Sequence, residues 1–203
     1  MTTLERIQAN LLSAQARIAS AAERSGRDAK SVTLIAVTKS VGVEEVRILA
    51  RLGVLHFGEN RVEQAGEKPA ALGTGVVWHM IGNVQRRKVR DVAQRFDRID
   101  AVDRLELAEA IDTRAAELGK TMPVLIEVNI SGESTKYGFA PDELDDAIAK
   151  MKSLLHLCVE GLMTMAPLAD DIEEARPVFR ALKELADRYG LPIRSMGMTN
   201  DFE

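Results

Sequence analysis

The sequence predicts an α/β fold in which a parallel sheet is covered by helices. Three observations predict it: short apolar runs typical of buried strands, amphipathic segments between them, and regular alternation of the two. Seven strands are expected, which fits either an open doubly wound sheet or a (β/α)8 barrel that is one strand short. The strands are predicted at 32–37, 54–57, 76–81, 98–102, 124–128, 157–162 and 193–195. The helices between them are predicted at 43–52, 61–71, 85–94, 104–118, 141–153 and 172–189.

A further amphipathic helix is predicted ahead of the first strand. Thr2 and Glu5 have the spacing of a capping box at its start, and Gly26 supplies a stop at its end. The residues of its apolar face follow a spacing of three and four, namely Leu4, Ile7, Leu11, Ala14, Ile18 and Ala21.

Capping residues and prolines set the bounds of the later helices. Asp103 is expected to cap the helix at 104–118, with Glu106 completing a capping box. Pro141 fits the first turn of its helix. Pro177 either lies in the first turn of a shorter helix or kinks a longer one.

Composition narrows the class of protein. The chain has 203 residues, is 46% hydrophobic and carries a net charge of −4, so we expect residues 1–203 to form a single domain. The acidic balance argues against a nucleic-acid partner, and no apolar stretch reaches the length of a membrane span. The single cysteine, Cys158, sits in an apolar run, which fits a reducing compartment. We therefore expect a soluble cytoplasmic protein.

Polar residues gather where the predicted strands end, and in a parallel barrel those ends carry the function. Lys39 closes the first strand run; it is either a solvated lysine or, if desolvated, an amine nucleophile toward carbonyl compounds. Asn60 follows the second run, where it also suits a helix cap, and His79 lies inside the third. Ser195 and Gly197 end the last run and suit either an ordinary turn or a bound phosphate. A phosphorylated carbonyl compound would use both the lysine and the phosphate site.

Six segments occur in an order that resembles the YggS/PROSC family of pyridoxal 5′-phosphate (PLP) binding proteins. They are residues 35–39, 56–60, 78–85, 128–129 with 133–138, 161–165 and 195–198. The resemblance covers nearly the whole chain. It implies a (β/α)8 TIM barrel of the alanine-racemase N-terminal type with an extra N-terminal helix. Members of this family continue through another helix and a last strand, which we expect this chain to lack.

The resemblance also implies a cofactor and the residues around it. Lys39 is expected to hold PLP as a Schiff base, and Ser195 matches the serine on the phosphate side. Neither a metal nor a catalytic residue is expected. The other residues expected at the cofactor are Asn60, His79, Met163 and Gly197.

The function implied is a PLP-binding protein in intracellular vitamin B6 homeostasis and amino-acid and keto-acid balance, without an established reaction. Its expected partners are small amines or amino acids and PLP-free apo-enzymes. Lys136 is a candidate for a transient second adduct with PLP. The protein is expected to be a monomer. The alternative is a PLP-dependent racemase or related isomerase with weak activity. That reaction needs an acid/base group on each face of the substrate, and Tyr137 is the sole remote candidate for the second. A Schiff-base aldolase rests on fold analogy alone.

Overall fold

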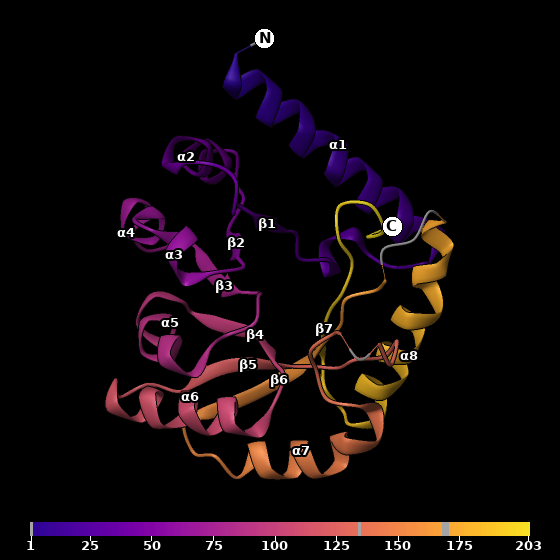
Figure 1. The fold of residues 1–203 in the computed structure, drawn as a ribbon. Coiled ribbons are helices and arrows are strands. Elements are labelled where there is room, and N and C mark those ends of the chain that lie inside the picture. The colour runs from indigo at the N-terminus through magenta and orange to yellow at the C-terminus, as the bar shows by residue number, and fades with distance from the viewer. Residues whose placement is uncertain (1, 134, 168–170) are drawn as a thin grey trace.

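Seven parallel strands follow one another in chain order across a single sheet. This order identifies an incomplete barrel, because a doubly wound sheet reverses its strand order partway across. In Figure 1 the sheet curls with the helices on its outer side. The computed structural model describes residues 2–133, 135–167 and 171–203, and within them β1 and β7 are the two end strands of the sheet. The strands are β1 Ile35–Val37, β2 His56–Glu59, β3 Val77–Met80, β4 Arg98–Val102, β5 Met122–Glu127, β6 Leu157–Met163 and β7 Ile193–Ser195.

The helices alternate with the strands as predicted. They are α1 Thr3–Arg24, α2 Val43–Arg51, α3 Val62–Ala65, α4 Lys68–Leu72, α5 Val89–Arg95, α6 Leu105–Glu117, α7 Leu144–Lys152 and α8 Ala175–Arg188. Short 3₁₀ turns follow α1 or lead into α5, α7 and α8, at Ala29–Ser31, Arg86–Lys88, Pro141–Glu143 and Ile172–Glu174. Within the described part of the chain, none of these helices has the length and apolar character needed to cross a membrane.

The structure corrects one predicted helix and one predicted helix cap, and it decides between the two positions considered for Pro177. The helix expected at 61–71 is divided into α3 and α4 by Gly66, whose φ of 52° lies in the left-handed region that interrupts a helix. Asp103 does not cap α6; Arg104 takes the N-cap position, and the Asp103 carboxylate accepts hydrogen bonds from Asn83 and Arg104 instead. Pro177 lies in the first turn of α8, so the shorter helix is the correct choice.

The capping box at the start of α1 is confirmed. The Glu5 backbone N–H donates to Thr2 Oγ1 at 3.3 Å, and the Thr2 backbone N–H donates to Glu5 Oε2 at 2.8 Å. We expect Thr2→Ala to lower the free energy of unfolding by about 1 kcal/mol, because the Glu5 amide loses its side-chain acceptor. Urea denaturation measures the loss, and Thr3→Ala, one residue inside the helix, is the control expected to change little. Equal losses in the two variants would contradict the prediction.

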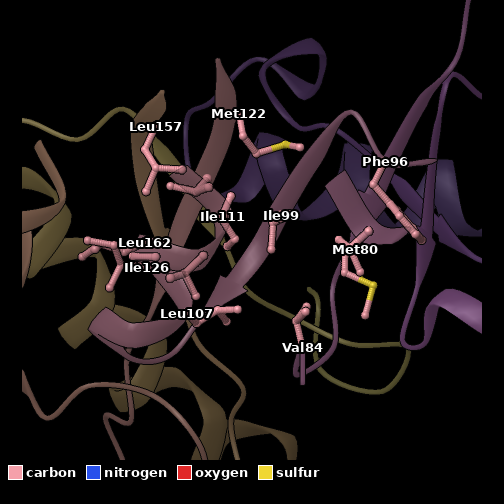
Figure 2. Packing of buried hydrophobic residues seen from close by; sticks show 14 of the residues in the cluster. Met80, Val84, Phe96, Ile99, Leu107, Ile111, Met122, Ile126, Leu157 and Leu162 are labelled. Carbon is pink, nitrogen blue, oxygen red and sulfur yellow. The ribbon is translucent and has the colours of Figure 1, made fainter. Parts of the chain in front are cut away.

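The main hydrophobic core lies between the outer face of the sheet and the helices. Leu107 and Ile111 of α6 belong to the same buried cluster as Ile99 of β4 and Ile126 of β5, and Figure 2 shows these side chains from close by. Successive side chains of a strand point to opposite faces of the sheet, so the residues next to Ile99 and Ile126 along their strands face the concave side.

A second, small cluster consists of strand residues only. Ala101, Leu125 and Met163 are buried together, with Ile193 packed against them. Because no helix contributes to this cluster, it lies on the concave side of the sheet. The polar residues at the carboxyl ends of the strands lie at the mouth of this concave side.

Candidate functional site

Lys39 lies two residues after the end of β1 and is exposed. Its ε-amine makes no hydrogen bond or ion pair with any residue that the structure describes. The residue before it is anchored: Thr38 is buried, and its backbone N–H donates to the Gly58 carbonyl at 3.0 Å. Lys39 is therefore solvated and not desolvated, and its unpaired amine stands at an anchored strand end where a carbonyl compound can reach it.

A buried ion pair lies beneath this strand end. Lys68 Nζ of α4 lies 2.7 Å from Glu59 Oε1 of β2 and donates a second hydrogen bond, also 2.7 Å, to the Thr38 carbonyl. Thr38 Oγ1 donates to the same Glu59 oxygen at 2.6 Å. Glu59 is 0% exposed and Lys68 is 7% exposed. The pair therefore joins the ends of β1 and β2 one residue before Lys39 and Asn60.

The sequence analysis did not identify this ion pair. Lys68 fell inside a segment predicted as one helix, where a lysine is usually solvated. The available signal was Glu59, a carboxylate at the end of an apolar strand run, which needs a cationic partner if it is buried.

A cavity of about 310 Å³ opens at the carboxyl ends of the strands. In its wall Gly82 packs closely against the Asn60 backbone, because an added Cβ there would lie 2.3 Å from the Asn60 carbonyl oxygen. Tyr137 is 61% exposed on its rim, which leaves the residue considered for a racemase acid/base group largely in solvent. The residues that line the cavity are Asn60, Ile81, Gly82, Asn83, Glu127, Val128, Asn129, Thr135, Lys136, Tyr137 and Met165.

Glu127 is the buried carboxyl group of this cavity. It is 8% exposed, and its carboxylate has no hydrogen-bond partner among the described residues. Burial, reinforced by the negative charge of Asp103, raises the pKa of Glu127 to about 7. Burial also raises the pKa of Asp103, although its contacts with Arg104 and Asn83 oppose that shift. The cavity therefore holds a carboxyl group that gains or loses its proton near neutral pH.

His79 lies within β3 and is buried in a polar chain of side chains. Its Nδ1 lies 2.6 Å from Asp100 Oδ2, and its Nε2 lies 2.9 Å from His56 Nδ1. The Arg98 side chain donates to the other Asp100 oxygen and pairs with Glu160. Burial first, then the charges of His79 and Arg98, lower the pKa of His56. The residues of this hydrogen-bonded series occupy strand positions next to those that face the main core: His79, for example, lies between Trp78 and Met80, which both belong to that core.

The remaining predicted residues lie around the end of β7. The Ser195 carbonyl accepts a hydrogen bond from the Thr164 amide, whereas its hydroxyl has no partner among the described residues. The amides of Met196 and Gly197 likewise donate to no described residue. Gly197 has a φ of 90°, and an added Cβ would lie 2.9 Å from Phe202 Cα. A hydroxyl and two free amides are suitable donors for an anion.

The six predicted cofactor residues therefore fall into three groups. Lys39, Ser195 and Gly197 lie at the carboxyl edge of the sheet at its two end strands, and Asn60 lines the cavity. His79 and Met163 are buried, the first in the polar chain and the second in the small apolar cluster. Their contacts with a cofactor stay predictions. Among the described residues, no three histidine, cysteine, aspartate or glutamate side chains are placed to hold a metal ion.

Comparison with known proteins gives the fold and the family. The model of the alanine racemase N-terminal domain matches residues 4–203. An alanine racemase from Clostridium difficile superposes with a TM-score of 0.68 at 21% identity, covering 82% of this chain and 46% of that one. At this identity the likeness supports the barrel fold alone.

Nearer relatives carry a more specific description. The pyridoxal phosphate homeostasis protein of Aquifex aeolicus is 38% identical over 92% of this chain and 85% of its own length. The protein of the same name from Escherichia coli K12 is 37% identical over 96% of this chain and 87% of its length. PipY from Synechococcus elongatus, solved with PLP bound, superposes with a TM-score of 0.77 at 32% identity, covering 91% of each chain. On these similarities the chain belongs to the family of pyridoxal phosphate homeostasis proteins, built on the alanine racemase N-terminal domain.

Proposed function

We propose that this protein binds PLP through Lys39 and takes part in the intracellular homeostasis of this cofactor. The observation that carries the proposal is the free Lys39 amine on the anchored end of β1. It is supported by the relatives named for PLP homeostasis and by the PipY structure described with PLP bound. When bound, PLP supplies an aldehyde that reacts reversibly with primary amines.

The residues present fit a phosphorylated aldehyde. Lys39 would bind the aldehyde carbon, forming a C=N bond and releasing one water molecule. The Ser195 hydroxyl and the free amides of Met196 and Gly197 would hold the phosphate. Gly197 suits this role because a side chain there would meet Phe202. Asn60 lines the cavity at the carboxyl ends of the strands and stays a proposed contact.

We further propose a carrier role, in which PLP is held and passed to PLP-free enzymes, in preference to catalysis of a reaction of its own. The exposed side chain of Lys39 supports this role, because water and small amines reach it without an opening motion. The relatives named above are described as homeostasis proteins, and a monomeric, cytoplasmic protein remains our expectation.

The test is an absorbance titration of the purified chain with PLP, followed by borohydride reduction and peptide mass mapping. We expect a saturable visible band and a reduced pyridoxyl-phosphate group on the peptide that contains Lys39. Pyridoxal, which lacks the phosphate, is the matched control and is expected to bind more weakly because the donors around Ser195 are unused. A reduced adduct spread over exposed lysines, without saturation, would overturn the proposal. Transfer of PLP from the loaded protein to a PLP-free enzyme then tests the carrier role.

A further inference from the structure

The cavity at the ends of β2, β3 and β5 contains a buried acid for which the proposed function has no use. Glu127 closes β5, is 8% exposed and lines the cavity, yet its carboxylate has no hydrogen-bond partner among the described residues. A carboxyl group buried without a partner is costly to ionise, and such groups cluster at binding and catalytic sites, so Glu127 is a candidate ligand-binding residue.

The charges that face Glu127 define what that ligand must be. Asp103, after β4, adds a second negative charge near it. Lys136, from the loop after β5, is the positive group of the cavity wall, but its amine already pairs with Glu133 Oε1 at 2.8 Å. Asp103 is itself paired with Arg104 as Lys136 is with Glu133, so no cation of the described residues pairs with the Glu127 carboxylate. A ligand with a positive hydrogen-bond donor would be held there, and an anion would be repelled.

The other lining groups favour a small organic cation over a bare metal ion. Asn60, Asn83 and Asn129 line the cavity together with Ile81 and Val128, so its wall combines amide groups with apolar carbon. At about 310 Å³ the cavity holds a molecule of several heavy atoms. Three N–H donors on one centre are best matched by a carboxylate with amide oxygens beside it, the donor pattern of a primary ammonium group.

We propose that this cavity is a binding site for the primary ammonium group of a small amine ligand, with the Glu127 carboxylate as its acceptor. The inference goes beyond the proposed function and does not require PLP to be bound. It makes Glu127 a ligand-binding residue at the end of β5, two strands away from the phosphate donors at the end of β7.

Proton linkage provides a specific signature of this site. Because Glu127 has a raised pKa of about 7, the free cavity is partly protonated at neutral pH, and ammonium binding requires the carboxylate. Ligand binding must then release a proton, roughly half a proton per site at pH 7. Affinity is expected to fall about ten-fold from pH 8 to pH 6, since the ammonium itself stays protonated throughout this range.

The experiment is isothermal titration calorimetry on the PLP-free, full-length chain with ethylamine, L-alanine and propionate. We expect ethylamine and L-alanine to bind and propionate, which lacks the amine, not to bind. Glu127→Gln should weaken binding at pH 8 by about ten-fold or more and remove the pH dependence. Glu109→Gln, the same change on the exposed side of α6, is the matched control and should bind as the wild type does.

Titration of the wild-type chain in two buffers of different ionisation enthalpy counts the released proton without any variant, so the test does not depend on how Glu127→Gln folds. Binding of propionate as tight as that of ethylamine, or binding of either amine without proton release at pH 7, would overturn the proposal. Since no arm contains PLP, these outcomes say nothing against the Lys39 linkage, and failure of the PLP titration would leave the ammonium site standing.

Discussion

Lys39→Ala is expected to abolish the visible absorbance band that PLP gives with the wild-type chain and to remove the reduced adduct from the Lys39 peptide. Alanine has no amine to condense with the aldehyde, so no covalent linkage forms at this strand end. Weak binding through the phosphate donors around Ser195 is expected to remain. Absorbance titration, together with borohydride reduction and mass mapping, measures both effects.

Lys39 is expected to react in preference to Lys136 because of their surroundings. The Lys136 amine is held by Glu133 at 2.8 Å and must break that ion pair before it can react, whereas the Lys39 amine has no partner among the described residues. Lys150→Ala, at an exposed position of α7, serves as the matched control. Retention of a saturable band in Lys39→Ala, with the reduced adduct on the Lys136 peptide, would contradict the prediction that PLP is linked to Lys39.

The hypothesis of a transient second adduct at Lys136 makes a separate prediction: Lys136→Ala keeps the absorbance band but slows the transfer of PLP to an acceptor enzyme.

The parallel sheet covered by helices was predictable because each strand is a short apolar run between helical segments. Runs such as that ending at Lys39 leave the sheet at its carboxyl edge, and a parallel sheet places all such ends together. The sequence alone could not choose between a barrel and a doubly wound sheet, because strand order depends on tertiary packing. It also missed the break at Gly66, since an isolated glycine in a helical pattern can be tolerated at a cost in stability.

The cofactor residues were predicted more completely than the groups that support them. Lys39, Asn60 and Ser195 follow strand ends and were identified by position and family resemblance. Lys68 and Glu127 were not, because burial decides their roles and local sequence does not report it. Asp103 had the right spacing for a helix cap, yet the neighbouring Asn83 amide binds its carboxylate. The available signal was an acidic residue at the end of an apolar run: Glu59 could have pointed to a buried cationic partner such as Lys68, and Glu127 to a buried carboxyl group.

Lys68→Met is expected to lower the free energy of unfolding by about 3–5 kcal/mol, because it leaves the Glu59 carboxylate buried without a cation. Glu59 has little to compensate the loss: Oε2 has no hydrogen-bond partner in the described structure, and Oε1 would keep only the Thr38 hydroxyl. The Thr38 carbonyl loses one of its two donors as well and keeps the Val41 amide. Chemical denaturation measures the change. Lys88→Met, the same substitution in the more exposed pair with Glu63, is the matched control and should cost far less.

A double-mutant cycle separates the charge from the lost packing. Glu59→Gln combined with Lys68→Met removes both charges while an amide oxygen still accepts from Thr38, so the double variant is expected to be more stable than Lys68→Met alone. A double variant as unstable as the single one would show that Lys68 acts through its packing and not through its charge. Because the pair joins the chain one residue before Lys39 to the chain one residue before Asn60, Lys68→Met should also weaken PLP binding under conditions where the chain is still folded. Stability and cofactor affinity are therefore coupled at this position: the buried charge that holds the two strand ends together also fixes the lysine from which the cofactor would be held.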